Sequence, residues 1–142
     1  MEKKRFQILF TSVGRRVELV QQFHEAARRL EISLCVWGAD ITPTAPAMCF
    51  CDEKAIVPRI KDKAYIPTLL ELCRENKIDA LIPTIDTDLL LLAENRERFD
   101  AIGTTVWVGS PEKVHLCRDK RLTAEYFHSI GLQSPSPVSD VK

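Results

Sequence analysis

Hydrophobic positions follow two different periods along this chain. Three short apolar runs bounded by small or polar residues are typical of buried strands: FQILFTS (6–12), ISLCVWGAD (32–40) and IDALIPT (78–84). Between the first two runs, apolar residues recur every three or four positions, as on one face of a helix. These residues are Val17, Val20, Phe23, His24, Ala27 and Leu30. The pattern predicts a strand, a helix and a second strand in succession.

The alternation continues to the end of the chain. A short strand is predicted at 55–58, a helix from about Ile66 with Pro67 in its first turn, and a helix over 87–99 with Asp86 as its N-terminal cap. TTVWVG (104–109) predicts the next strand, and Ser110 followed by proline and glutamate predicts a helix start. A last helix is predicted with four apolar side chains on one side: Leu122, Tyr126, Phe127 and Ile130. Gly131 is expected to end this helix.

Strands separated by helices require crossover connections, which are right-handed and place successive strands in parallel. The predicted fold class is therefore α/β, a Rossmann-like parallel sheet with helices on both faces. In such folds ligands collect at the carboxyl ends of the strands. Four segments are expected at that edge: 11–15, 40–42, 83–88 and 109–111.

The composition argues against two classes of partner, nucleic acids and membranes. The 142 residues suit one domain, and 20 basic residues balance 20 acidic ones, so no basic field would attract nucleic acid. Neither a signal peptide nor a run of about 18 apolar residues is found, which predicts a cytoplasmic protein without a membrane partner. The five cysteines lack metal-site spacing and are expected to be free thiols.

The first candidate site is the turn TSVGRR (11–16). It lies where the first βα turn of a dinucleotide-binding fold would be, but the G-x-G-x-x-G pattern is missing, which argues against a nicotinamide cofactor. Two interpretations remain. Ser12, Gly14, Arg15 and Arg16 form an anion site at the start of a helix, or the glycine makes a tight turn and the arginines are solvated. Asp40 is expected to cap a loop rather than to bind a ribose.

Paired acids follow the strand at 78–84. Asp86 and Asp88, with Glu94 on the same helix, could hold Mg²⁺ or act in acid–base chemistry. Helix starts also collect aspartate because the helix dipole favours negative charge there, and this explanation is preferred. The histidines are scattered, so neither a hydrolytic triad nor a metal site is predicted.

The C-terminal stretch CRDKRLTAEYFHSIGLQSPSP (117–137) resembles a segment of the ATP-grasp superfamily in which an Asp-Lys pair opens a helix. ILFTSVGRRVELVQQF, GADITPTAP and DALIPTIDTDLLLLAEN resemble the N-terminal, or pre-ATP-grasp, domain of ligases related to the carbamoyl phosphate synthase large subunit and biotin carboxylase. The resemblance extends over essentially the whole chain. It divides the sequence into a Rossmann-like domain, 1–117, and a helix and linker, 118–142.

The resemblance implies an ATP-dependent ligase that phosphorylates a carboxylate to an acyl phosphate, which an amine then captures. Lys120 matches the lysine that approaches the nucleotide phosphates, as a cation must where negative charge grows. Asp86 and the turn from Ser12 to Arg16 would face a small carboxylate or amine substrate. ATP and Mg²⁺ would bind in the complete enzyme, and neither is expected to bind tightly to this chain.

The family's glycine-rich loop, adenine pocket and late magnesium ligands are not found in these 142 residues. The expectation is therefore a domain that works with a missing C-terminal ATP-grasp domain and does not hydrolyse ATP alone. The alternative is a free-standing Rossmann-like module that binds a nucleotide or anion and regulates a partner. Exposed apolar side chains around Leu122, Tyr126 and Phe127 would favour the ligase domain, and self-association through them would give a homo-oligomer.

Overall fold

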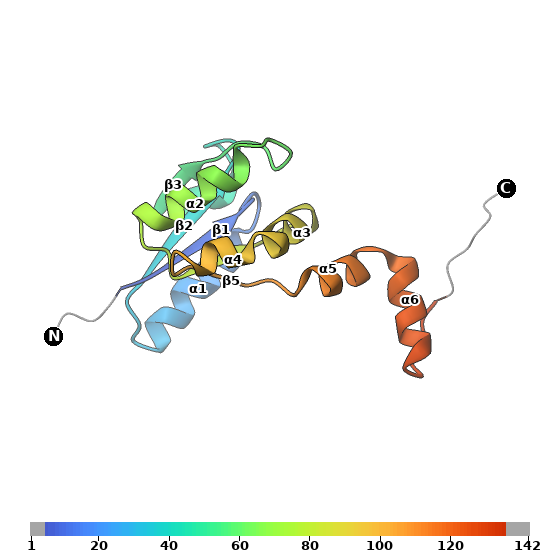
Figure 1. Cartoon of the computed structure of the whole chain (residues 1–142). Coiled ribbons are helices and arrows are strands. Elements are labelled where there is room, and N and C mark those ends of the chain that lie inside the picture. Colours follow the sequence, from blue (N-terminus) through green and yellow to red (C-terminus); the bar gives the residue numbers. More distant parts are fainter. Residues whose placement is uncertain (1–4, 136–142) are drawn as a thin grey trace.

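The computed structural model describes residues 5–135, which form an α/β domain followed by two helices (Figure 1). The elements in chain order are β1 (Phe6–Thr11), α1 (Val17–Arg29), β2 (Leu34–Asp40), the 3-10 helix η1 (Pro46–Phe50), β3 (Glu53–Ile56), α2 (Tyr65–Glu75), β4 (Ala80–Pro83), α3 (Asp86–Glu94), α4 (Arg96–Asp100), β5 (Thr105–Val106), α5 (Pro111–Arg118) and α6 (Lys120–Ser129). Each strand predicted from the sequence is present, so the alternation of elements is confirmed.

The five strands form one sheet in the order β3-β2-β1-β4-β5, and every neighbouring pair is parallel. In the central strand, Leu9 is paired with Trp37 of β2 on one side and with Leu81 of β4 on the other. The chain builds outward from β1 to β3 and then crosses to β4, so the order reverses between β1 and β4. Loops diverge at such a switch point and leave a crevice at the carboxyl ends of the strands.

Helices cover both faces of the sheet, as predicted. Alternate residues of β1 point to opposite faces. Ile8 and Phe10 pack with Val20 of α1 in one buried cluster, where the rings of Phe10 and Phe23 meet edge to face at 5.0 Å. Leu9 belongs to a second cluster on the other face, which is built with α2, α3 and α4. The sheet is therefore buried on both sides, which explains the continuous apolar runs of its strands.

Gly38 allows η1 to approach β2 closely. A Cβ atom at this position would lie 2.6 Å from the sulfur of Cys51 and 3.0 Å from the sulfur of Met48. Cys51 and Met48 are both buried, so neither sulfur can move away into solvent. A residue with a side chain would push η1 away from the sheet.

Three local predictions were wrong. Asp86 does not cap α3, because Ile85 is the capping residue and Asp86 is the first helical residue. The helix expected over 87–99 is two helices, since Asn95 ends α3 and its side chain donates to the Leu91 carbonyl at 2.8 Å. Leu30 is 68% exposed rather than buried, because α1 has already ended.

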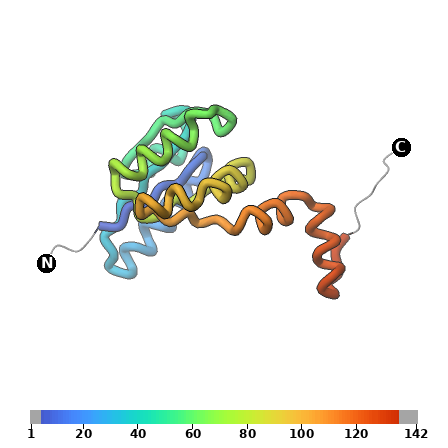
Figure 2. The backbone as a smooth tube through the Cα atoms, viewed as in Figure 1, coloured from blue at the N-terminus to red at the C-terminus, as the bar shows by residue number. Residues whose placement is uncertain are grey.

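Helices α5 and α6 project from the sheet as an arm (Figure 2). Ser110 caps α5, as predicted, by accepting a hydrogen bond from the Lys113 amide at 3.4 Å. The chain changes direction at Asp119, between α5 and α6. The Asp119 side chain caps α6 by accepting a hydrogen bond from the Arg121 amide at 2.9 Å. Gly131 follows α6 with a φ of +79°, a left-handed conformation suited to glycine.

Residues 136–142 of the predicted linker lie outside the described residues. Within residues 5–135, we find no helix long and apolar enough to cross a membrane. The same range contains no group of three or more side chains that could hold a metal ion.

Candidate functional site

The turn after β1 uses its backbone amides within the protein. The amide of Val13 donates to the Ala39 carbonyl at 3.2 Å, that of Gly14 to the Asp40 carboxylate at 2.8 Å, and that of Arg16 to the Val13 carbonyl at 2.9 Å. Ser12 and Gly14 both have positive φ, +53° and +45°. The segment therefore makes a tight joint between β1 and α1, and these three amides are not available to an anion.

The two arginines of the turn have different environments. Arg16 donates from Nη2 to the Thr84 carbonyl at 3.1 Å, which ties the turn to the loop after β4. Thr84 in turn donates to the Ser12 carbonyl at 2.7 Å. Arg15 is exposed and has no ion-pair partner within residues 5–135. Of the pair, Arg15 is thus the one whose guanidinium is available to bind a ligand.

Asp40 holds the turn in place. Its Oδ2 accepts from Gly14, and its Oδ1 accepts from the Ile41 amide at 2.8 Å. The prediction of a loop acceptor is confirmed. Each oxygen keeps a second lone pair, so the carboxylate can still accept further hydrogen bonds.

A buried polar cluster lies beneath the switch point. Asp88 on α3, Tyr65 on α2 and Thr11 on β1 are all essentially inaccessible to solvent. The Tyr65 hydroxyl donates to the two Asp88 oxygens at 2.9 and 3.0 Å, and the Thr11 hydroxyl donates to Oδ2. Three elements that are distant in sequence are joined here through one carboxylate.

Burial governs the ionisation of this cluster. Desolvation raises the pKa of Asp88, and the hydrogen bonds from Thr11 and Tyr65 act in the opposite direction. Desolvation also raises the pKa of Tyr65, and the neighbouring Asp88 charge adds to it. The phenol therefore remains protonated and acts as a donor to Asp88.

Asp88 is the residue that sequence reasoning undervalued. A preference for acids at helix starts explained both Asp86 and Asp88, although only Asp88 is buried. Its spacing from Leu92 was the available signal, because residues four apart share a helix face and Leu92 is a core residue.

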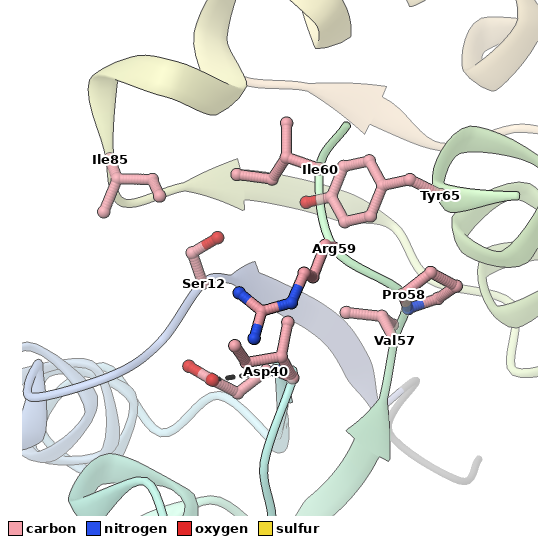
Figure 3. Close-up of a pocket in the computed structure, with 9 residues that line it drawn as sticks. Ser12, Asp40, Val57, Pro58, Arg59, Ile60, Tyr65 and Ile85 are labelled. Atoms are coloured by element: carbon pink, nitrogen blue, oxygen red, sulfur yellow. Dashed lines mark hydrogen bonds between the residues drawn. The ribbon is translucent and has the colours of Figure 1, made fainter. Parts of the chain in front are cut away.

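Two cavities open at the carboxyl edge of the sheet. The sheet-edge cavity, about 310 Å³, is lined by Ser12, Asp40, Arg59, Ile60, Tyr65 and Ile85 among others (Figure 3). The arm cavity, about 380 Å³, lies between the sheet and the projecting helices and is lined by Asp86, Trp107, Lys113, Arg118 and Lys120 among others.

The structure divides the predicted site residues between these cavities. Asp86 and Lys120 both line the arm cavity, although 34 positions separate them in the sequence. Ser12 lines the sheet-edge cavity, and its neighbours Gly14, Arg15 and Arg16 do not line it. The structure thus does not bring the predicted set together: Ser12 lines one cavity, Asp86 and Lys120 line the other, and the remaining three residues line neither.

The arm cavity combines an aromatic surface with positive charge. The Trp107 side chain is 59% exposed. Lys113, Arg118 and Lys120 outnumber the single acid, Asp86, among its ionisable lining residues. Lys120 is the first residue of α6 and is exposed. A flat ring and a cluster of cations suit a ligand with a planar group and several negative charges.

Comparison with solved structures shows the same fold in carboxylases and a synthetase. The complete pyruvate carboxylase of Rhizobium etli matches with a TM-score of 0.61 and 15% identity over 96% of this chain and 13% of that chain. The biotin carboxylase subunit of pyruvate carboxylase matches with a TM-score of 0.58 and 19% identity over 90% of this chain and 28% of that one. N5-carboxyaminoimidazole synthetase from Staphylococcus aureus, complexed with ADP, matches with a TM-score of 0.59 and 17% identity, over 92% and 32%.

This chain therefore spans at most about a third of these relatives. No curated protein sequence matches it significantly. A family model described as the N-terminal domain of PylC-like proteins matches residues 8–107, which is more than half of the chain. With the parallel five-stranded sheet, these findings confirm the expected pre-ATP-grasp domain. The chain belongs to the family of PylC-like N-terminal domains.

Proposed function

We propose that this domain is the N-terminal, substrate-side domain of an ATP-dependent carboxylate–amine ligase that works through an acyl phosphate. The family match supports a role within an ATP-grasp ligase in general terms. One observation of the structure carries the finer proposal: Lys120 and Asp86 line the same cavity at the carboxyl edge of the sheet. The proposed chemistry is similar to the reaction of carbamoyl phosphate synthase.

The position of Lys120 supports its proposed role as a phosphate-binding cation. It is the first residue of α6, where the helix dipole opposes a positive charge, so an anionic ligand would relieve an unfavourable placement. In the proposed reaction its ammonium group contacts the ATP phosphates and offsets the charge that grows on the phosphoryl oxygens. Arg118 lines the same cavity and adds positive charge.

ATP and Mg²⁺ are proposed to bind between this domain and an ATP-grasp domain. Mg²⁺ would neutralise negative charge on the phosphates. The cations of the arm cavity would hold the protein side of those phosphates, and the indole of Trp107 offers a surface for a planar group. The carboxylate or amine substrate is proposed to enter from the same edge of the sheet. A cytoplasmic location is part of this proposal.

Exposed apolar side chains on the arm favour this proposal over the regulatory module. Tyr126 is 46% exposed, Phe127 37%, Ile130 51% and Leu132 53%, and the first three lie on or directly after α6. Large apolar side chains exposed close together in the chain are typical of a region covered by a partner. The proposed partner is the ATP-grasp domain, with a second copy of this chain as the other candidate.

The test is a hydroxylamine trap for the acyl phosphate. The 142-residue chain is incubated with ATP, Mg²⁺, hydroxylamine and a panel of carboxylic acids, alone and with the ATP-grasp polypeptide encoded after or beside it. We expect hydroxamate and ADP only from the combination. Turnover by the 142 residues alone, or none from the combination with any acid, would contradict the proposal.

Lysine variants make the test specific. Lys120→Gln should lower kcat/KM of the combination by about 100-fold, the usual cost of losing one donor to developing charge. Lys54→Gln is the matched control, because Lys54 is an exposed residue of β3 that lines neither cavity. Equal activity of the Lys120 variant and its control would remove Lys120 from the proposal.

A further inference from the structure

The sheet-edge cavity is separate from the arm cavity and contains a cation that the sequence did not point to. Arg59 follows β3 and extends its guanidinium across the cavity between Ser12 and Asp40 (Figure 3). It has no ion-pair partner among the described residues 5–135. An arginine held over a cavity without a carboxylate partner is suited to binding an anionic group.

The walls of this cavity are mostly apolar. Val57, Pro58, Ile60 and Ile85 line it, and the ring of Tyr65 stands beside Ile60 in Figure 3. The Tyr65 hydroxyl donates to the buried Asp88, so its hydrogen is not available to a ligand. This wall is also rigid, because the phenol is anchored at both Asp88 oxygens. A ligand here would place an aliphatic body against these side chains.

The second charge of the cavity is Asp40. Two backbone amides fix its carboxylate, and one lone pair on each oxygen is left, so Asp40 can still accept a hydrogen bond from a ligand. Asp40 and Arg59 face each other in Figure 3, yet they do not form an ion pair. The space between them suits a ligand that carries an anion and a hydrogen-bond donor close together.

We propose that the sheet-edge cavity binds a small aliphatic carboxylic acid with a hydroxyl or amino group beside the carboxylate. Arg59 binds the carboxylate, Asp40 accepts from the neighbouring donor, and the aliphatic chain packs between Ile60 and Tyr65. A volume of about 310 Å³ is at the small end for ligand sites, which favours a compact acid. That this acid is the one activated by the ligase rests on the proposed function; its binding does not.

The test is an NMR titration of the ¹⁵N-labelled 142-residue chain with four small molecules. The probes are 2-hydroxy-4-methylpentanoate, leucine, 4-methylpentanoate and AMP. We expect shifts at Ile41, Ile60 and Ser12 with the first two probes, and binding at least about tenfold weaker with 4-methylpentanoate, which lacks the donor for Asp40. The stronger of the first two identifies the donor as hydroxyl or amine.

Substitution of Arg59 separates specific binding from adventitious contact. Arg59→Gln should weaken the best acid by about tenfold or more, and Arg59→Lys should do so less, because lysine keeps the charge without the planar fork. Arg98→Gln is the matched control, since Arg98 is an exposed arginine of α4 that lines neither the sheet-edge cavity nor the arm cavity. Both variants change exposed side chains, so folding should be preserved.

Three results would overturn this inference. One is the absence of shifts at the cavity residues with every acid at roughly 10 mM, a concentration that detects even weak ligands. Another is equal affinity of Arg59→Gln and the Arg98 control. The third is preferential binding of AMP, which would assign the cavity to a nucleoside. Failure of the hydroxylamine trap together with acid binding would refute the ligase and leave this site in place.

Discussion

The Tyr65→Phe variant tests the buried cluster that joins β1, α2 and α3. The substitution keeps the ring, which packs in the core and forms one wall of the sheet-edge cavity, and removes only the hydroxyl. That hydroxyl makes two contacts with Asp88, at 2.9 and 3.0 Å, which we count as one shared hydrogen bond to a carboxylate. Of the side-chain donors within residues 5–135, Asp88 would keep only the Thr11 hydroxyl.

The expected loss follows from burial. A hydrogen bond to a charged group contributes about 1.5–3 kcal/mol, and a buried carboxylate deprived of a donor has no water to replace it. For 142 residues this corresponds to a fall in Tm of about 5–10 °C. The free energy of unfolding is measured by urea titration, followed through the fluorescence of the two tryptophans, Trp37 and Trp107.

The pH dependence of this loss provides a second readout. Burial raises the pKa of Asp88, so the native state binds the proton more readily than the unfolded state, and the ionised carboxyl lowers stability at neutral pH. Tyr65 stabilises the ionised form, so its hydroxyl should contribute more at pH 7 than at about pH 4, where Asp88 takes up a proton. The effect of the substitution should shrink in acid.

Tyr126→Phe is the matched control, because it makes the same chemical change at an exposed tyrosine. Its free energy of unfolding should stay within about 0.5 kcal/mol of the parent. If Tyr65→Phe were as stable as Tyr126→Phe at pH 7, or if its loss were the same at both pH values, the assignment of a buried, ionised and hydroxyl-dependent Asp88 would be refuted.

Other substitutions and reagents test separate features. The free energy of unfolding of the parent protein should fall as pH rises through the raised pKa of Asp88. Asp88→Asn removes the titrating group, so the variant should not show this fall. Parallel pH profiles of the two proteins in urea titrations would contradict this. Gly38→Ala should cost about 1–3 kcal/mol through overpacking, whereas Gly109→Ala, whose nearest neighbour would be 3.6 Å away, should cost far less. A thiol reagent should modify Cys49 and Cys117 rapidly in the native protein and all five cysteines in denaturant, because burial raises the pKa of Cys51 to about 11 and that of Cys73 to about 12; rapid native labelling of more than two thiols would contradict the packing.

Local sequence signals located the helices and strands but only some of their ends. Ser110 with a following proline, and Gly131 after an apolar stripe, marked helix ends correctly because capping acts within one turn of chain. Asn95 ended a helix that apolar periodicity had carried through, since an asparagine inside a polar run gives no comparable signal. Asp86 had the expected chemistry for a cap and lies one position too late.

The functional site, too, could be predicted only in part from the sequence. The resemblance indicated Lys120 and Asp86, and the structure places both on the arm cavity. Asp88 was explained as a helix-start acid, and its four-residue spacing from Leu92 was the one local signal of burial. Arg59 was passed over because nothing within a few residues of it reveals its environment. Asp88 becomes distinctive only when Thr11 and Tyr65 surround it, and Arg59 only when the loop after β3 brings it opposite Asp40.

The sequence by itself determined the class of fold, because the periods of its apolar positions are local properties of strands and helices. It also determined the family, since residues 8–107 retain that family's pattern. Tertiary structure alone decided which polar groups are buried, which amides are already occupied and how the site residues separate into two cavities. These outcomes depend on contacts between residues that lie tens of positions apart, and such contacts exist only once the sheet has brought its strands together.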